Sequence, residues 1–103
     1  MYKLSFFVPK EQKEKVKEAL FSIGVGAYEN YDKCSWEIEG TGQFRPLQGA
    51  NPFLGKVGEV ERVVEYKVEM ICKDELIQKA VQTLKETHPY EEVAYEVIKL
   101  EDL

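Results

Sequence analysis

The spacing of the apolar residues constrains the fold of this chain more than any other feature. Apolar residues fall mainly at every second position over residues 2–8, 59–72 and 92–100. Apolar residues instead recur at intervals of three and four over residues 10–23 and 75–87. Alternation is typical of half-buried strands, and the longer interval is typical of amphipathic helices. These segments therefore predict three strands and two helices.

A weaker alternation over residues 28–39, clearest at Cys34, Trp36 and Ile38, adds a fourth strand after the first helix. The resulting order, strand–helix–strand–strand–helix–strand, is that of the ferredoxin-like α+β fold, in which an antiparallel sheet carries two helices on one face. The strand at 59–72 is longer than the usual five or six residues. We expect it to leave the sheet with its neighbour as a two-stranded arm, whose unpaired edges another copy of the chain can cover.

Composition allows one domain, residues 1–103, and excludes several classes of protein. Leu, Ile, Val and Phe make up 29 of the 103 residues, which is enough for a small core. No apolar run has the length of a membrane span, and the first residues are too short an apolar run for a signal peptide. The pI of about 5.0 argues against a nucleic-acid partner. We expect a cytoplasmic protein in which Cys34 and Cys72 are reduced, buried thiols.

Two stretches do not fit the periodic pattern. The first, residues 40–58, is rich in glycine and contains Pro46 and Pro52. The second, His88-Pro89-Tyr90-Glu91-Glu92, ends the second helix. We single out Arg45, Asn51, His88, Tyr90 and Glu91 as candidate ligand-binding residues, and His88 and Glu92 as candidate metal ligands.

The run GTGQFRPLQGANPFLGKVGEVERVVE, followed by HPYEEVAYEV, resembles the central domain of the Nif-three-like dimetal proteins, the YqfO group. In that family a CutA-like or PII-like domain is inserted between two halves that bind a pair of metal ions. The resemblance covers nearly the whole chain, as a free-standing copy of the insert. It implies a CutA/PII-like fold and a homo-oligomer, with a trimer favoured. The halves that supply the metal ligands are missing, so the resemblance implies no dimetal hydrolase activity here.

The glycine-rich stretch has two interpretations from its residues alone. It is either a shaped connection between strands that packs Phe44, Phe53 and Leu54 against the domain or a neighbour, or a loop that cradles a ligand. Glycine-rich backbone can present N–H groups to an anion, and Arg45 suits a carboxylate or phosphate. The sequence has no phosphate-loop motif that would support nucleotide binding.

The second stretch contains His88, the only histidine of the chain. His88 either caps the helix or contacts a metal or ligand together with its neighbours Tyr90, Glu91 and Glu92. A lone histidine beside carboxylates makes a poor closed zinc site. Threefold symmetry would bring three copies of His88 together only if they converge on the axis.

The sequence therefore predicts a small, non-enzymatic, homo-oligomeric binding or regulatory domain, whose partner is a protein or a small ligand. One alternative is a CutA-like protein that binds a divalent metal. A second alternative is an enzyme that uses the glycine-rich loop and Arg45 on a phosphorylated substrate, although no nucleophile or general base stands out.

Overall fold

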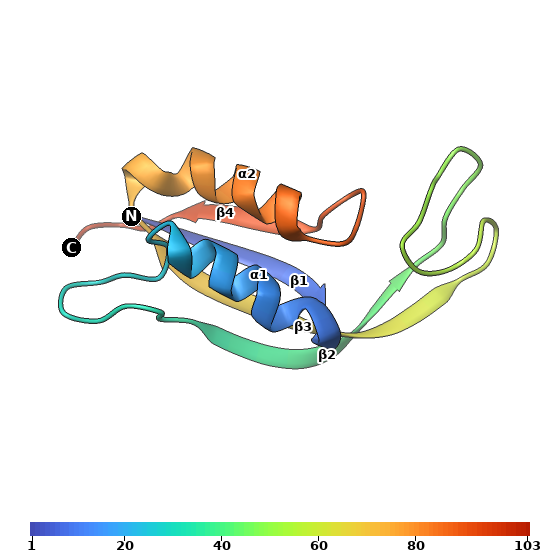
Figure 1. The fold of residues 1–103 in the computed structure, drawn as a ribbon, viewed down its shortest axis with the longest axis horizontal. Helices are drawn as coiled ribbons and strands as arrows, with labels where there is room; N and C mark the ends of the chain where they lie inside the picture. Colours follow the sequence, from blue (N-terminus) through green and yellow to red (C-terminus); the bar gives the residue numbers. More distant parts are fainter.

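The computed structural model describes all residues from Met1 to Leu103, and its elements follow the predicted order (Figure 1). The bounds are β1 Tyr2–Pro9, α1 Lys10–Ser22, β2 Trp36–Phe44, β3 Glu61–Cys72, a 3₁₀ turn η1 Asp74–Leu76, α2 Ile77–Thr87 and β4 Tyr95–Lys99. The α+β prediction is confirmed.

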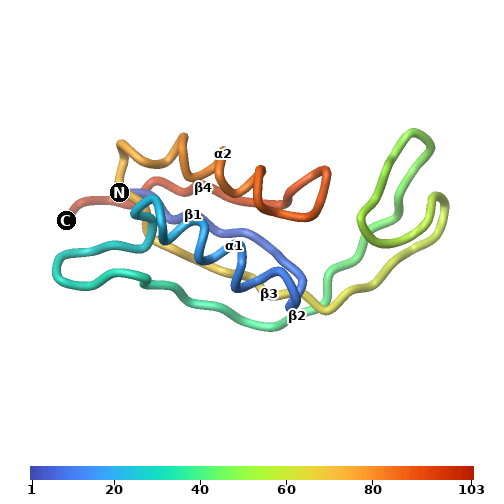
Figure 2. Tube along the Cα trace, in the orientation of Figure 1, coloured from blue at the N-terminus to red at the C-terminus, as the bar shows by residue number.

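The four strands form one antiparallel sheet in the order β2-β3-β1-β4. Both helices run side by side over one face of this sheet, and the two chain ends lie close together at one end of it (Figure 2). Gly24, at a φ of 102°, turns the chain directly after α1, as a glycine at a helix C-terminus commonly does.

The core lies between the helices and the covered face of the sheet. The alternating residues of β1 and β3 supply one side, and the helical stripes supply the other. The fully buried apolar residues of the core are Leu4, Phe6, Val8, Val16, Leu20, Val25, Val68, Met70, Cys72, Ala80 and Leu84.

The other face of the sheet has no helix over it. Trp36 and Ile38 of β2 and Ile98 of β4 are each at least half exposed there, at 57%, 53% and 50%. The same face also carries Lys3, Phe7 and Ile71. Lys3 pairs with both Ile71 and Ile98, and Phe7 pairs with Lys67, which in turn pairs with Ile38. We call this surface the open face.

The predicted arm is present (Figure 1). β1 pairs with β3 only as far as Glu65, whereas β2 pairs with β3 out to Glu61. Residues 41–44 and 61–64 therefore pair only with each other. The chain between them, residues 45–60, forms a loop at the far end of the arm, which we call the arm loop.

The predicted bounds of the second strand were wrong. β2 begins at Trp36 and continues through Gly40 and Gly42 to Phe44, so the first part of the glycine-rich stretch is strand. The earlier residues instead make a tight turn, in which Tyr28 and Tyr31 exchange backbone hydrogen bonds at 2.8 and 2.9 Å.

The two cysteines differ in their surroundings. Cys72 is buried in the core as predicted, and burial raises the pKa of its thiol. Cys34 lies before β2 and is partly exposed, so its predicted burial was wrong. Both thiols are free. Neither helix has the length and apolar character needed to pass through a lipid bilayer.

Candidate functional site

The two unusual stretches of the sequence meet around one cavity. It has a volume of about 350 Å³ and lies between the arm loop and the turn that follows α2. Four of the predicted site residues line it, namely Arg45, Tyr90, Glu91 and Glu92. The remaining lining residues are Phe44, Pro46, Leu47, Ala50, Pro52, Phe53 and Leu54. Six of the eleven lining residues are hydrophobic.

Tyr90 is the central side chain of the cavity. Its ring centroid lies 6.2 Å from that of Phe44 and 6.2 Å from that of Phe53, and both pairs are tilted. Such tilted pairs are favourable for aromatic rings. Tyr90 therefore joins the turn after α2 to the end of β2 and to the arm loop.

The hydroxyl of Tyr90 binds Glu65, a residue that does not line the cavity. It donates a hydrogen bond to Glu65 Oε2 at 2.9 Å. Burial, together with this hydrogen bond and the charge of Glu65, raises the pKa of Tyr90 well above its usual value of 10. The phenol is consequently neutral at physiological pH and cannot serve there as a base.

Gly42 makes room for this hydrogen bond. A Cβ atom at residue 42 would lie 1.9 Å from Glu65 Oε1, whereas one at Gly40 would meet nothing within 4 Å. The absence of a side chain at residue 42 thus leaves room for the Glu65 carboxylate to lie over β2 and to bind the Tyr90 hydroxyl. Glu65 could not be singled out from the sequence, because alternation places it among the ordinary polar residues of a strand face.

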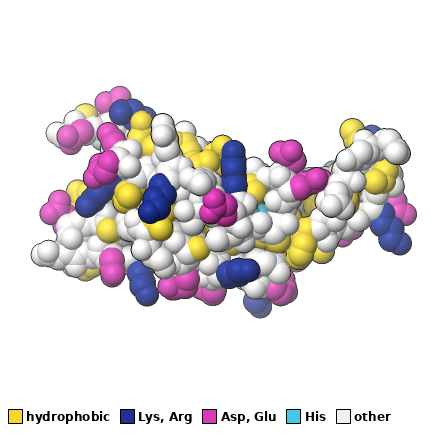
Figure 3. Space-filling model, turned by 45° about the horizontal axis from the view of Figure 1, so that its top comes forward, with side chains coloured by type: hydrophobic (Ala, Val, Ile, Leu, Met, Phe, Trp, Pro, Cys, Tyr) yellow, Lys and Arg dark blue, Asp and Glu magenta, His cyan; other side chains and the backbone are white.

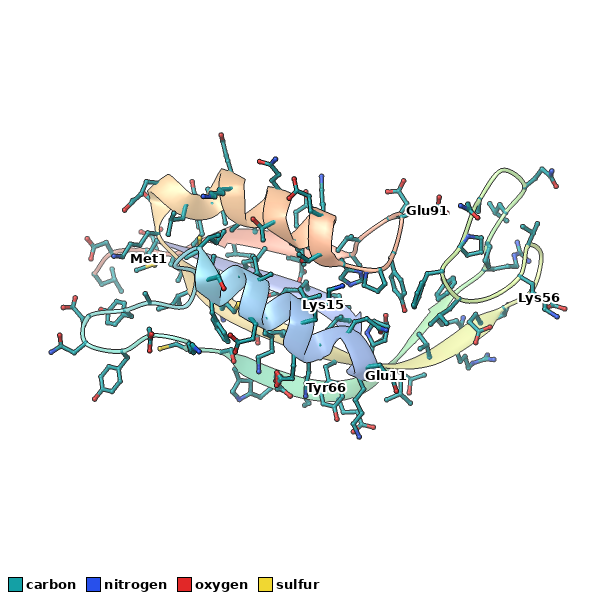
Figure 4. The ribbon with its side chains drawn as sticks, viewed as in Figure 1. Met1, Glu11, Lys15, Lys56, Tyr66 and Glu91 are labelled. Atoms are coloured by element: carbon teal, nitrogen blue, oxygen red, sulfur yellow. The ribbon has the colours of Figure 1, made fainter.

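Asn51 and Glu91 fix the arm loop to the body of the domain. The backbone N–H of Asn51 donates to Glu91 Oε2 at 2.9 Å, across 40 residues of sequence. In Figure 4, Glu91 lies on the turn after α2, facing the loop that carries Lys56. Asn51 thus contributes its backbone N–H to this contact, and its side chain does not line the cavity.

His88 lies behind the cavity and is buried, with 6% of its surface exposed. Its Nε2–H donates to the carbonyl oxygen of Phe7 at 2.7 Å, and its Nδ1 accepts the backbone N–H of Tyr90 at 3.1 Å. A carbonyl can only accept and an N–H can only donate, so these partners fix the neutral tautomer. Burial lowers the pKa of His88, in spite of the hydrogen bond to Phe7.

These contacts make His88 a positioning residue for Tyr90. The two rings also pack edge to face, with centroids 4.9 Å apart. A metal ion at His88 would have to replace one of the two hydrogen bonds. No group of three or more His, Cys, Asp or Glu side chains that could hold a metal ion occurs in the structure.

Charged side chains lie where the arm loop meets the body of the domain. Acidic side chains are visible at this junction in the space-filling view (Figure 3). Arg45 and Glu92 are exposed at the cavity, and neither takes part in an ion pair. The cavity thus combines aromatic walls with one free cation and one free carboxylate.

Comparisons with known proteins agree with the family resemblance that the two sequence motifs indicate. No family model matches the sequence. The "GTP cyclohydrolase 1 type 2 homolog" of Bacillus subtilis is 41% identical over 99 residues, which are 96% of this chain and 26% of that protein. The chain therefore spans about a quarter of the length of the curated relatives it matches.

Solved structures agree in fold. A Bacillus cereus protein related to NIF3 superposes with a TM-score of 0.84 at 39% identity, covering 98% of this chain and 26% of that one. CutA1 from Pyrococcus horikoshii superposes with a TM-score of 0.70 at 20% identity, covering 100% of this chain and 86% of that one. Nearly the whole of this chain is thus similar to one segment of NIF3-related proteins, and this segment makes up about a quarter of their length. The fold of the chain is that of CutA.

Proposed function

We propose that this chain is a non-enzymatic, homo-oligomeric binding domain that holds a small ligand in the cavity between the arm loop and the turn after α2. The observation that carries the proposal is the meeting of both unusual sequence stretches around one largely apolar cavity. Apolar walls with a few convergent polar groups are typical of small-molecule sites. The proposed ligand-binding set is Arg45, Asn51, His88, Tyr90 and Glu91.

These residues divide into two roles. Arg45 lines the cavity and is free to contact a ligand, whereas Tyr90 supplies its ring. His88 and Glu91 act through other groups, since His88 holds Tyr90 and Glu91 holds the backbone of Asn51. The buried imidazole and the neutral phenol are committed to structural hydrogen bonds, which supports binding over catalysis.

Assembly is supported by the apolar surface that a single chain leaves uncovered. Trp36, Ile38 and Ile98 are exposed on the open face, and Leu47 and Val57 are exposed on the arm loop. Exposed apolar patches on small domains are typical of protein interfaces. The resemblance to CutA and PII favours three subunits. The two free thiols favour a reducing compartment, which we propose is the cytoplasm.

The activity in the relatives' name is not part of the proposal. The chain corresponds to 26% of the Bacillus subtilis relative and contains one histidine. A divalent metal at His88 and Glu92 is the weaker candidate, because both ring nitrogens of His88 already have partners.

The cavity can be tested by a ligand-observed NMR screen of small metabolites. Ala50 lines the cavity, whereas Gln48 is exposed outside it. We expect compounds that bind the native chain to be lost from Ala50→Phe, whose ring fills the cavity, and kept by Gln48→Phe. Ligands that bind both variants equally well would place the binding site elsewhere. Native mass spectrometry of the same samples reports the subunit number, and a monomer at micromolar concentration would contradict the assembly part.

A further inference from the structure

The cavity presents two opposite charges that the domain itself does not use. Arg45 and Glu92 both line it, and neither forms an ion pair. Glu91, the other carboxylate of the lining, already accepts the backbone N–H of Asn51. One guanidinium and one carboxylate are therefore left for a ligand.

The aromatic walls of the cavity favour a cationic group. The Tyr90 ring packs against those of Phe44 and Phe53, with its centroid 6.2 Å from each. Because its hydroxyl donates to Glu65, Tyr90 turns its ring rather than its polar tip to the cavity. A phenol that donates to a carboxylate is also more electron-rich. Aromatic ring faces attract ammonium groups, and such rings recur in sites for substituted ammonium ligands.

We propose that the cavity binds a zwitterionic ammonium carboxylate, with its ammonium group against the aromatic rings beside Glu92 and its carboxylate toward Arg45. This inference rests on the proposed function, since it names the ligand class of the same cavity. Arginine matches a carboxylate with two parallel hydrogen bonds. A volume of about 350 Å³ is within the range of small-ligand sites.

Ligands with a single charge match the cavity less well. An anion would leave the Glu92 carboxylate close to a like charge, and a cation would do the same for Arg45. Like charges at short range disfavour binding. A zwitterion gives each of the two side chains an opposite charge.

Three probes of nearly equal shape separate these cases. Glycine betaine carries a trimethylammonium group and a carboxylate, choline carries only the cation, and 3,3-dimethylbutanoate carries only the anion. We would titrate each into the full chain and follow the aromatic proton shifts of Phe44, Phe53 and Tyr90. We expect glycine betaine to bind at least fivefold more tightly than either of the other two.

Variants assign each charge to its side chain. Arg45→Gln should bring glycine betaine to the affinity of choline, and Glu92→Gln should bring it to that of 3,3-dimethylbutanoate. The matched controls are Arg62→Gln and Glu59→Gln, exposed residues that do not line the cavity. Both controls should leave the affinity unchanged.

Three results would overturn the inference. Glycine betaine binding no more tightly than the better of the singly charged probes would exclude a zwitterion site, while leaving the cavity as the proposed binding site. Equal losses in Arg45→Gln and Arg62→Gln would show a general charge effect. If none of the three probes shifts the cavity rings, the zwitterion class fails, and the separate metabolite screen with Ala50→Phe decides the proposed function.

Discussion

Gly42 and Gly40 lie two residues apart on the same face of β2, yet they have different roles. Adding a methyl group at residue 42 would push the Glu65 carboxylate away from Tyr90, whereas residue 40 is open. We expect Gly42→Ala to lower the free energy of unfolding by about 1 kcal/mol, the net value of one hydrogen bond. Gly40→Ala should have little effect. Urea denaturation of both variants measures the difference.

The same hydrogen bond can be removed from its other end. Tyr90→Phe keeps the ring packed against Phe44 and Phe53 and removes only the donor to Glu65. If the account of Gly42 is correct, Gly42→Ala should cost much less in a Tyr90→Phe background than alone, since both changes remove one interaction. Additive losses would mean that Gly42 acts on something other than this bond.

The burial of His88 leads us to expect that the free energy of unfolding depends on pH. Its folded pKa is lowered by burial, so the imidazole stays neutral in the fold while the unfolded chain takes up a proton below about pH 6.5. Proton uptake by the unfolded state favours unfolding. The contribution of His88 is thus complete above that pH and is lost as the pH falls toward the folded pKa.

Chemical denaturation at pH 7.5 and pH 5.5 checks this. We expect the native chain to be less stable at pH 5.5, and His88→Gln to show a smaller change between the two values. No other side chain of this sequence has an ordinary pKa in that interval. An equally large change in His88→Gln would show that another group titrates.

At the scale of elements, Glu37 joins β2 to α1. It accepts hydrogen bonds from Lys13 and, at 2.8 Å, from Lys17. Lys13 also lies 3.9 Å from the ring centroid of Tyr66. These two lysines lower the pKa of Glu37. The edge strand β2 is therefore held to the helix by charge, at a place where the core offers it few apolar contacts.

We expect Glu37→Gln to destabilise the chain by about 1 kcal/mol at pH 7, as for well-formed ion pairs near the surface. The stabilisation is present above about pH 4.3, the unfolded pKa of Glu, and is lost as the pH falls through the lowered folded pKa. The native chain and the variant should therefore converge as the pH falls below the lowered folded pKa of Glu37. Glu59→Gln, at an exposed position of the arm loop without an ion pair, is the control for urea denaturation.

Strand bounds were predictable where one face is apolar, as in β1 and β3. They were not predictable in β2, because Gly40 and Gly42 carry no side chain to show a period. Pairing with β3 extends the strand through both glycines in spite of their low strand propensity. The turn at Tyr28 lacks that pairing, so its aromatic residues do not form a strand.

The candidate site was predictable as two motifs but not as one cavity. Arg45, Tyr90, Glu91 and Glu92 were singled out by their composition and setting, and the structure brings them together. Spacing alone could not show that Glu91 binds the backbone of Asn51, because these residues are 40 apart. Nor could it show that both nitrogens of His88 are occupied by backbone groups.

At the scale of the whole molecule, we expect the open face to form the interface of the proposed oligomer. Ile38→Lys would introduce a charge among its exposed apolar residues, so we expect a smaller particle in analytical ultracentrifugation. Thr41→Lys, an exposed position on the opposite face of the same strand, should keep the native mass. Equal masses for Ile38→Lys and the native chain would place the interface elsewhere.

The position of β1 in the sheet has a consequence for synthesis on the ribosome. Of the four strands β1 is made first, but its two neighbours are β3 and β4, and β4 ends at Lys99. β1 therefore lacks one of its two partners until the residues of β4 have left the ribosome. Contacts between such distant segments form slowly, because a long loop must close first. The sheet is thus completed only after β4 has been made, and β1 keeps one unpaired edge until then.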